Sequence, residues 1–398
     1  MTIRDAVVLA AGEGTRLRPL TRHRPKPMLP AANRPILEYV FDALIDAGIE
    51  RITVVVGYKH DRVQNHFGSD YRDVPIGYVH QQKQLGSGHA LLQASEAVDD
   101  PFIVVNGDQI ADPRMVAAVM EAAQEGDAVA RLAVIEREEV GSYGAVTLEG
   151  DRVVDFIEKP QAGTYHLLNA GVYAFDGRIF DVLDETPRRE GDLDLPDAIG
   201  SIMAADEPIG AVRTRGIWID ATYPWDLLAV ARDLLAAGWI DVDEAGEGTW
   251  IADSARIHDS AVVQSPVVVG PDAVVGPGAV VGPHTALGRN VTVGANAVVQ
   301  SSVVDEDTRV DAGATLVDCV TGQGVRVGAG TVVPGGSADV TVAGAVHEDQ
   351  RLGAVLADRV RLGGGASVAP GSLVGPNAEV DAGGYVRGTV KADARVMR

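Results

Sequence analysis

The sequence predicts an α/β fold with a mostly parallel sheet in its first half and a parallel β-helix in its second half. Residues 1 to about 235 alternate short apolar runs, typical of buried strands, with a segment of helical spacing. From Ile251 onward an aliphatic residue recurs at every sixth position. We therefore expect a first domain over 1–228, a connector over 229–250 and a repeat domain over 251–398.

The first half contains three short runs rich in β-branched residues, at 6–10, 52–57 and 102–108. Such runs are typical of strands that are buried on both faces. Apolar residues at helical spacing over 36–45 predict a helix between the first two. Strand, helix and strand in this order form a parallel sheet covered on both faces, and such sheets bind ligands beyond the carboxyl ends of their strands. We therefore expect functional residues directly after these runs.

The second half carries a repeat with a period of six residues. Aliphatic residues occupy positions 251, 257, 263, 269, 275, 281, 287, 293 and 299, then 304, 310 and 316, and later 356, 362, 368, 374, 380 and 386. This period suits a parallel β-helix, in which three hexads close one coil and the aliphatic side chains stack inside. The segment 333–355 breaks the period, so we expect a protruding loop or an irregular coil there. The helical pattern over 224–240 predicts the connector.

Charge and composition exclude several classes of protein. Acidic residues outnumber basic ones 56 to 34, for a formal net charge of −22, which argues against a nucleic-acid partner. This charge suits a surface that keeps the protein soluble. It also suits a cell with a salty interior, where salt screens the repulsion between acidic residues, and we favour this second interpretation. The single cysteine, Cys319, excludes an internal disulfide and a thiolate metal cluster. No apolar run reaches about 18 residues and the N-terminus lacks the pattern of a secretion signal, so we expect a cytoplasmic protein without a membrane partner.

A glycine-rich segment, LAAGEGTRLRPLT at 9–21, follows the first predicted strand. Gly12 and Gly14 let the backbone approach a ligand closely, and successive N–H groups in such a turn bind anions. Arg16 and Lys26 add positive charge, which suits a polyphosphate. A tight turn would explain the two glycines but not these two cations.

AAGEGTRLRPLT followed by PKPM resembles the signature of the sugar-1-phosphate nucleotidylyltransferases, or NDP-sugar pyrophosphorylases, and the similarity runs from residue 5 to about 230. It is neither the Walker loop nor the dinucleotide fingerprint. The resemblance implies a Rossmann-like fold and a loop that holds a nucleoside triphosphate. It implies catalytic roles for Arg16, on the β- and γ-phosphates, and for Lys26, on the reacting phosphates. It also implies that the nucleotide is bound by Leu9, Ala11, Gly12, Gly14 and Thr15.

Further stretches occur in the order in which this family has them. QQKQLGSGHA at 81–90 resembles its nucleobase loop, which implies nucleotide binding by Gln81, Gln84, Gly86 and Ser87. From the residues alone, a solvated turn explains the two glutamines equally well. SYGAV, IEKP and LLNAGVYAF resemble the sugar pocket, which implies that hydroxyls are bound by Gly144, Glu158 and Asn169 and that the sugar phosphate is bound by Lys159.

Two carboxylates resemble the metal ligands of the family. Asp108 ends the NGD stretch and Asp220 ends the WID stretch, which implies that they bind Mg²⁺. By itself Asp108 could equally cap the helix that follows. A carboxylate beside the packed tryptophans of the WID stretch needs water, a partner or a metal.

The resemblance implies transfer of a nucleotidyl group from a nucleoside triphosphate to a sugar-1-phosphate, with release of pyrophosphate. UTP is the first choice, because LGSGHA is close to the loop of bifunctional uridylyltransferases of the GlmU type. dTTP is the second choice, because IEKP and WID are closer to thymidylyltransferases. The sugar substrate would be glucose-1-phosphate or N-acetylglucosamine-1-phosphate.

The second half resembles the hexapeptide-repeat left-handed β-helix family, which implies a homo-oligomer, a trimer or a multiple of it. In GlmU-type relatives this domain also transfers acetyl from acetyl-CoA to glucosamine-1-phosphate, with a His base and nearby Asn and Lys residues. Between 319 and 390 the chain has no Lys and one His, His347, which we expect to be an exposed loop residue. A scaffold is therefore favoured over a second active site, which stays an alternative. A non-catalytic homologue ranks last, because Arg16, Lys26, Asp108 and Asp220 are all present.

Overall fold

The computed structural model describes residues 3–137, 143–158 and 166–397. Contacts divide the chain into two compact units. The first contains Met1–Glu13, Pro25–Met28 and Ile36–Asp220, and the second contains Gly14–Arg24, Leu29–Pro35 and Ala221–Arg398. Three segments of the predicted first domain, 14–24, 29–35 and 221–228, thus group with the repeat.

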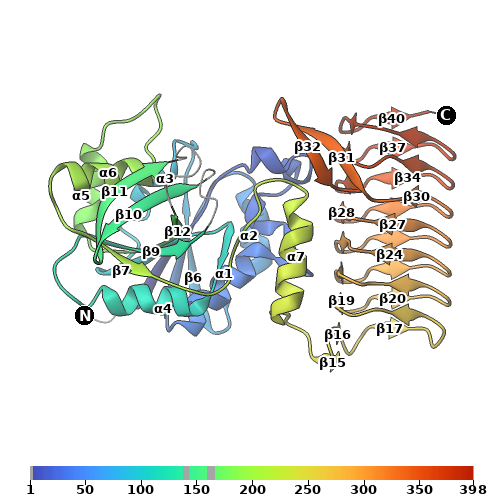
Figure 1. Ribbon diagram of the computed structural model, residues 1–398, viewed down its shortest axis with the longest axis horizontal. Helices are drawn as coiled ribbons and strands as arrows, with labels where there is room; N and C mark the ends of the chain where they lie inside the picture. The colour runs from blue at the N-terminus through green and yellow to red at the C-terminus, as the bar shows by residue number, and fades with distance from the viewer. Residues whose placement is uncertain (1–2, 138–142, 159–165, 398) are drawn as a thin grey trace. The chain divides into compact units, whose positions relative to one another are not determined.

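The first unit is built on a ten-stranded sheet (Figure 1). Its strands, in spatial order, are β10 (Gly144–Glu149), β11 (Arg152–Glu158), β13 (Ile209–Arg213), β9 (Ala130–Glu136), β12 (Leu167–Phe175), β7 (Phe102–Asn106), β1 (Asp5–Ala10), β4 (Arg51–Val56), β6 (Val74–His80) and β5 (Asp70–Tyr71). The block β7–β1–β4–β6 is parallel throughout, whereas β12 runs antiparallel to both of its neighbours, β7 and β9. The predicted α/β fold is confirmed, with a parallel centre extended by antiparallel strands.

Six helices cover the two faces of this sheet: α1 (Ile36–Asp46), α2 (His60–Phe67), α3 (Ser87–Leu92), α4 (Pro113–Ala122), α5 (Arg178–Glu185) and α6 (Leu195–Ala204). Leu37 of α1, Val63 of α2 and Val116 of α4 share one buried cluster with Val8 of β1. The other face carries α3, α5 and α6, whose apolar residues pack against the next side chain of β1, Val7. Adjacent residues of a strand point to opposite faces, so both faces of β1 are buried, as the unbroken apolar run predicts.

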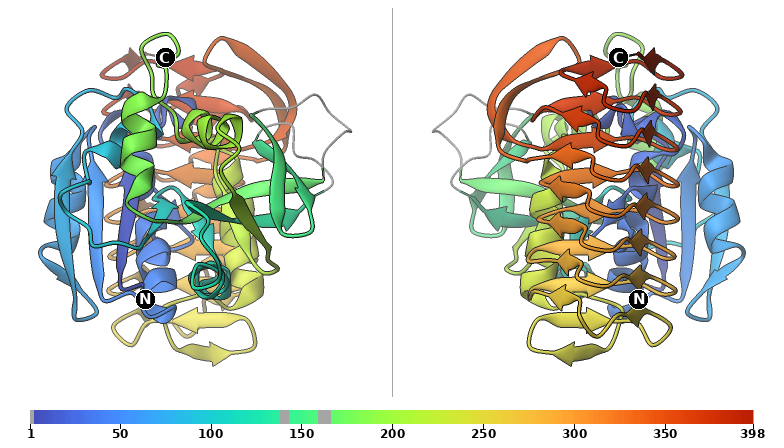
Figure 2. Two further views of the ribbon diagram at one scale, coloured as in Figure 1. Left: turned by 90° about the vertical axis from the view of Figure 1, so that its left-hand side faces the viewer. Right: turned by 90° about the vertical axis from the view of Figure 1, so that its right-hand side faces the viewer.

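The second unit contains a parallel β-helix of three sheets, whose coils are stacked in Figure 2, coloured from yellow to red. The first sheet consists of β15 (Glu244–Gly246), β16 (Thr249–Ile251), β19 (Val267–Val269), β22 (Thr285–Leu287), β25 (Val303–Val304), β28 (Cys319–Thr321), β33 (Ala354–Leu356), β36 (Ser372–Val374) and β39 (Thr389–Val390). The second consists of β17 (Arg256–Ile257), β20 (Val274–Val275), β23 (Thr292–Val293), β26 (Arg309–Val310), β29 (Arg326–Val327), β34 (Arg361–Leu362), β37 (Glu379–Val380) and β40 (Arg395–Val396). The third consists of β18 (Val262–Val263), β21 (Val280–Val281), β24 (Val298–Gln300), β27 (Thr315–Val317), β30 (Val332–Val333), β35 (Ser367–Val368) and β38 (Tyr385–Val386).

The register of these sheets confirms that three hexads close one coil. Thr249 pairs with Val267, 18 residues later in the chain. Ala286 pairs with Val303, 17 residues later, so one corner of that coil is a residue shorter. This shorter coil explains why the aliphatic period shifts by one position after residue 299. The inward aliphatic residues form one continuous buried core.

One helix and one hairpin accompany the coils. Helix α7 (Asp226–Ala237) packs against β22, β25 and β28 and covers their outward residues, which are buried. The segment that breaks the period forms an antiparallel hairpin of β31 (Ser337–Val342) and β32 (Ala345–Arg351), which projects from the coils in Figure 1. The segment protrudes, as expected, but the expectation of an irregular conformation is wrong, because these residues pair with one another.

The prediction of an exposed His347 is also wrong. His347 lies on β32 and is half-buried. Its ring centroid lies 4.4 Å from that of Tyr223 and 5.2 Å from that of Trp225. Aromatic packing thus accounts for this histidine.

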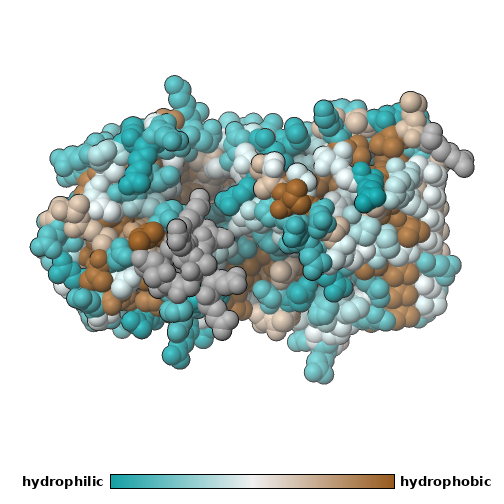
Figure 3. Space-filling model, turned by 45° about the horizontal axis from the view of Figure 1, so that its top comes forward, coloured by the Kyte–Doolittle hydropathy of each residue, from teal (hydrophilic) through white to brown (hydrophobic). Residues whose placement is uncertain are grey.

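Among the described residues, no helix is long and apolar enough to cross a membrane. Hydrophilic residues are spread over the face that Figure 3 shows, interrupted by apolar patches.

Candidate functional site

Two short strands bring Asp108 and Asp220 to the same place in the first unit. β8 (Gln109–Ala111) pairs antiparallel with β14 (Trp218–Asp220), and Asp220 lies opposite Gln109, the residue after Asp108. Gly107 lies in the turn between β7 and β8, close to β1. A Cβ at this position would lie only 3.0 Å from the Cβ of Ala10, so glycine allows the close approach. Its N–H donates to the carbonyl of Leu9 at 2.9 Å, which fixes the end of β7 against β1.

Lys26 lies between these two carboxylates. Its Nζ is 2.9 Å from Oδ2 of Asp108 and 2.6 Å from Oδ1 of Asp220. Burial by itself would lower the pKa of Lys26, but the charges of Asp108 and Asp220 raise it above the ordinary lysine value. The ammonium group therefore stays protonated across the physiological range.

The alternative role of Asp108 as a helix cap does not apply. The residue before α4 is Asp112, whose Oδ1 accepts a hydrogen bond from the backbone N–H of Arg114 at 2.9 Å. Asp108 precedes β8 instead, and about a third of its side chain is exposed.

The donor set suits a hard cation. Two carboxylates already converge on one positive group, and carboxylate oxygens are the ligands that Mg²⁺ prefers. Among the described residues, no group of three or more His, Cys, Asp or Glu side chains is arranged to hold a metal ion. Asp108 and Asp220 could hold such an ion together with substrate oxygens and water.

The loop after β1 lies at the carboxyl edge of the parallel block. Leu9 is half-buried, Ala11 is buried and Gly12 is exposed. A Cβ added to Gly12 would meet nothing within 4 Å, and its backbone is not in the left-handed region. No protein contact requires glycine there, so the space beside Gly12 is available for a ligand.

Gly14, Thr15 and Arg16 belong to the second unit. Gly14 adopts φ +61° and begins a 3₁₀ helix, η1 (Thr15–Leu17). Its carbonyl accepts from the hydroxyl of Thr21 at 2.8 Å. Thr15 and Arg16 are exposed on this helix.

Gln81 is buried and its amide is held inside its own loop. The Nε2 group donates to the carbonyl of Gly86 at 3.0 Å and lies 2.8 Å from Nδ1 of His89. Burial, together with the charge of Arg188, lowers the pKa of His89, so its ring is neutral and Nδ1 can accept. These bonds use both amide hydrogens of Gln81 and orient its Oε1 as an acceptor.

Gln84 and Ser87 are placed by different neighbours. Gln84 is exposed, and a Cβ added to Gly57 would lie 2.9 Å from its Nε2 and 2.8 Å from the carbonyl oxygen of Ala11. The Gln84 amide and this carbonyl therefore lie beside the same point of the chain. Ser87, half-buried, donates from its backbone N–H to Oδ1 of Asp194 at 3.0 Å.

Three of the predicted sugar-binding residues meet on β10, β11 and β12. Gly144 pairs with Glu158, and a Cβ added to Gly144 would lie 3.1 Å from Oε2 of Glu158 and 3.6 Å from the Cβ of Asn169. The Asn169 amide donates to the hydroxyl of Tyr173 at 2.6 Å. Lys159 lies outside the described residues.

The sequence interpretation missed two residues that orient this machinery. Burial raises the pKa of Tyr173 to about 12, so its phenol stays neutral and can accept from Asn169. Asp194 holds Ser87 across 107 residues of chain and immediately precedes α6. For Asp194 the only signal in the sequence was its position before a helical segment with a proline in its first turn. This pattern is typical of any helix start and does not indicate a functional residue.

Two family models match the chain. One, described as nucleotidyl transferase, matches residues 5–237. The other, described as GMPPB C-terminal domain, matches residues 263–382.

Curated relatives match more than half of the chain. A UTP–glucose-1-phosphate uridylyltransferase of Haloferax volcanii is 37% identical over 225 residues, 56% of this chain and 93% of the relative. The bifunctional protein GlmU of Methanocaldococcus jannaschii is 35% identical over 233 residues, 58% of this chain. The match spans only 54% of that GlmU, about half of its length.

Solved structures agree with these matches. A UDP-glucose pyrophosphorylase complexed with UDP-glucose is 25% identical with a TM-score of 0.53, over 59% of this chain and 99% of that one. A UDP-glucose pyrophosphorylase from Acinetobacter baumanii gives the same identity and TM-score and is covered over 94% of its length. Because the first family model covers more than half of the 398 residues, the chain belongs to the nucleotidyl transferase family.

Proposed function

We propose that this protein transfers a nucleotidyl group from UTP, or as second choice dTTP, to glucose-1-phosphate or N-acetylglucosamine-1-phosphate. The products would be the NDP-sugar and pyrophosphate. The observation that carries the proposal is the buried Lys26 ammonium group held between Asp108 and Asp220. This charge cluster lies at the carboxyl edge of the sheet, where α/β proteins bind ligands, and its position supports a catalytic role.

The chemistry follows from charge. A phosphate oxygen of the sugar-1-phosphate attacks the α-phosphorus, and the bond from that phosphorus to the oxygen bridging to the β-phosphate breaks. The attacking oxygen is already anionic, so no general base is needed. The main task of the protein is to align two anions and to neutralise their charge.

The residues take these roles in the proposal. Lys26, permanently charged, steadies the reacting phosphates, and Arg16 supports the departing pyrophosphate. Mg²⁺ held by Asp108 and Asp220 would supply further neutralisation of the α-phosphate and the attacking group. The backbone of Leu9, Ala11, Gly12, Gly14 and Thr15 binds the nucleotide, Gly144, Glu158 and Asn169 bind sugar hydroxyls, and Lys159 binds the sugar phosphate.

Gln81 supports a uracil or thymine base. Its amide hydrogens are engaged by Gly86 and His89, which leaves Oε1 as an acceptor. The N3–H of uracil and thymine is a donor that matches this acceptor, as is the N1–H of guanine, whereas N3 of cytosine and N1 of adenine are acceptors themselves. The preference for uracil or thymine over guanine rests on the resemblance of the LGSGHA, IEKP and WID stretches. Gln84, Gly86 and Ser87 would complete the base site.

We propose that the chain consists of a first domain of 1–228, a connector of 229–250 and a β-helix of 251–398. The β-helix serves as a scaffold in this proposal. It would assemble the chain into a homo-oligomer such as a trimer. The acetyltransferase alternative is not favoured, because His347 packs against Tyr223 and Trp225 and is not arranged as a base. The curated GlmU matches cover 58% of this chain and 54% of the relatives.

A product assay tests the proposal. The purified full chain is incubated with Mg²⁺, one of UTP, dTTP, GTP, ATP and CTP, and either glucose-1-phosphate or N-acetylglucosamine-1-phosphate, and pyrophosphate is measured. We expect release with UTP first and dTTP second, and loss of release when EDTA removes the metal. Absence of pyrophosphate with every pair would overturn the proposal. Release of free CoA from acetyl-CoA and glucosamine-1-phosphate would establish the bifunctional alternative.

A further inference from the structure

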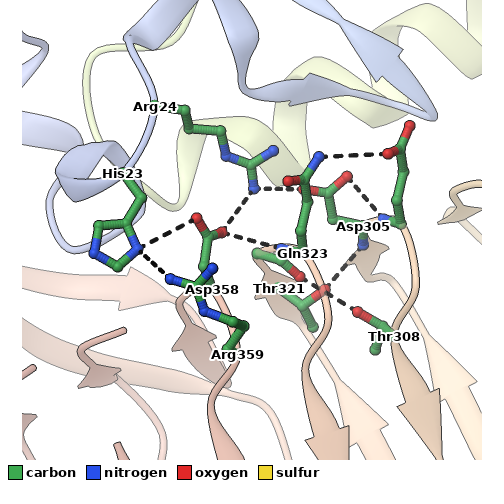
Figure 4. Close-up of polar contacts among 10 residues, drawn as sticks. His23, Arg24, Asp305, Thr308, Thr321, Gln323, Asp358 and Arg359 are labelled. Carbon is green, nitrogen blue, oxygen red and sulfur yellow. Dashed lines mark hydrogen bonds and ion pairs between the residues drawn. The ribbon is translucent and has the colours of Figure 1, made fainter. Parts of the chain in front are cut away.

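Arg24, in the segment Gly14–Arg24 of the second unit, is buried against two carboxylates of the β-helix (Figure 4). Its Nη2 donates to Oδ2 of Asp305 and, at 3.2 Å, to Oδ1 of Asp358. The side chains of Arg24, Asp305 and Asp358 are only 5%, 7% and 6% exposed. This ion cluster is therefore shielded from water, unlike the many ion pairs on the surface.

Hydrogen bonds within the coils also hold both carboxylates. Oδ1 of Asp305 accepts from the backbone N–H of Glu306 at 2.9 Å, and the N–H of Asp305 donates to the hydroxyl of Thr321 at 2.9 Å. Oδ1 of Asp358 accepts from the backbone N–H of Gln323 at 3.1 Å. A Cβ added to Gly322 would lie 2.3 Å from this same oxygen, so only glycine allows Asp358 its position.

Neighbouring side chains add to the cluster. Nδ1 of His23 lies 3.9 Å from Oδ2 of Asp358 and 3.2 Å from Nη2 of Arg359. Burial by itself would lower the pKa of Arg24, but the charges of Asp305 and Asp358 raise it above the ordinary arginine value. Two adjacent residues of the segment, His23 and Arg24, are thus both anchored to the β-helix.

We propose that Arg24, Asp305 and Asp358 form a positioning cluster through which the β-helix fixes the segment Gly14–Arg24 for binding of the nucleoside triphosphate. The inference rests on the proposed function, because Gly14, Thr15 and Arg16 are the residues of this segment assigned to the nucleotide. Arg24 is a positioning residue and does not touch substrate. The repeat domain then contributes to the affinity for one substrate through residues about 300 positions away in the chain.

The segment Gly14–Arg24 has little regular structure of its own to restrict its conformation. Between Gly14 and Arg24 the chain has only 3₁₀ helices, η1 and η2 (Leu20–Arg22), which are short and weakly stabilised by their own hydrogen bonds. Arg16 is exposed, so no burial of its own side chain fixes it. Loss of the contacts of Arg24 would let the segment populate further conformations. The free energy needed to order the segment would then reduce the binding affinity for the nucleotide.

The test uses Asp305→Asn, Asp358→Asn and the double variant in the full chain, with steady-state kinetics and hydrogen–deuterium exchange. We expect the double variant to raise KM for the nucleoside triphosphate about tenfold, as for loss of a buried charged hydrogen bond, with KM for the sugar phosphate changed less than about twofold. Amides of the segment 14–24 should exchange faster. Arg24→Lys, which keeps the charge but not the guanidinium fork, should lie between wild type and Arg24→Met.

Asp318→Asn is the matched control. Asp318 is also a buried carboxylate of the β-helix, 4% exposed, and its partner is Arg351, 3.1 Å away on the hairpin. This variant should leave KM and exchange of the segment 14–24 unchanged. An equal effect of Asp318→Asn, or a double variant with unchanged exchange in 14–24, would overturn the inference, as would faster exchange with unchanged KM. The exchange measurement needs no turnover, so failure of the proposed function, seen as an inactive wild type, is recognised separately.

Discussion

At the scale of single residues, Lys26 and the two aspartates around it determine the charge of the candidate site. Lys26 is 8% exposed, and its ammonium group neutralises two carboxylates that would otherwise repel each other. Its raised pKa means that the charge is fully present below the ordinary lysine pKa and is lost only above the raised value. The stabilisation of Asp108 and Asp220 therefore does not change near neutral pH.

We predict that Lys26→Met lowers kcat/KM about a hundredfold or more, because a preorganised charge at the reacting phosphates is removed. The variant should also unfold at a lower temperature without metal, since two carboxylates are left facing each other. Addition of Mg²⁺ should raise its unfolding temperature more than that of the wild type. Thermal unfolding followed by circular dichroism, with and without Mg²⁺, measures this.

Asp108→Asn in the Lys26→Met background serves as the control for that metal effect. With one carboxylate neutralised, the additional Mg²⁺ stabilisation should disappear. If Lys26→Met unfolds at the same temperature with and without Mg²⁺, the two aspartates do not form a cation site.

Residue identities in the site were predictable where they belong to local motifs. Asp108 and Asp220 end short recognisable stretches, and the structure brings them together with Lys26. Arg24 carried no such signal, because its partners lie 281 and 334 residues away in the chain. Tyr173 was missed for a related reason: an aromatic residue in an apolar strand looks like core until its hydroxyl is seen to meet Asn169.

At the scale of elements, the site depends on the short pair β8 and β14, and the cap of helix α4 supports it. Asp112 follows β8 directly and is 2% exposed. It caps α4 through the N–H of Arg114, and its own N–H donates to the carbonyl of Ile217 at 2.9 Å, next to β14. One aspartate thus joins the helix start to the strand pair that positions Asp108 and Asp220.

We predict that Asp112→Ala lowers the free energy of unfolding by about 1–2 kcal/mol, the usual cost of a lost N-cap. Asp112→Asn, which retains a cap acceptor, should cost less. Hydrogen bonds from Arg114 are the main cause that lowers the pKa of Asp112, so the ionised form stabilises the fold above the ordinary aspartate pKa. That contribution is lost as the pH falls through the lowered value.

Urea unfolding of the wild type, Asp112→Asn and Asp112→Ala, at neutral pH and near pH 3, measures both effects. The difference between the wild type and Asp112→Asn should shrink at the acidic pH. A difference that grows as the pH falls would contradict the assigned direction of the pKa shift.

The hairpin β31–β32 shows an element that the hexad analysis overlooked although its signal was present. SADVTV alternates outward and inward residues, and Ala343 and Gly344, both with positive φ, form a two-residue turn before β32. Such turns are typical of tight hairpins. The break in the six-residue period therefore marks a change to the two-residue period of a β-hairpin.

At the scale of the whole molecule, the fold class followed from two patterns in the sequence. Buried apolar runs indicated the sheet of the first unit, and the hexads indicated the coils, down to the shift after residue 299. The grouping of Gly14–Arg24 and Leu29–Pro35 with the repeat was not predictable, because it arises from long-range contacts, such as those of Arg24 with Asp305 and of β2 (Pro30–Ala31) with α7. Such long-range contacts produce no repeating pattern in the sequence of the segment itself.

The net charge of −22 gives a prediction for the molecule as a whole. Like charges on one compact body repel each other, and salt screens them over a distance that falls from about 10 Å at about 0.1 M to about 3 Å at about 1 M. We predict that KCl raises the unfolding temperature steeply at low concentration and that the rise levels off near 1 M. Calorimetric melts over a KCl series measure the curve, with an equal series of sucrose as the uncharged control. A rise that is linear to high salt, and matched by sucrose, would indicate general exclusion of cosolute from the surface and would contradict the screening of charge.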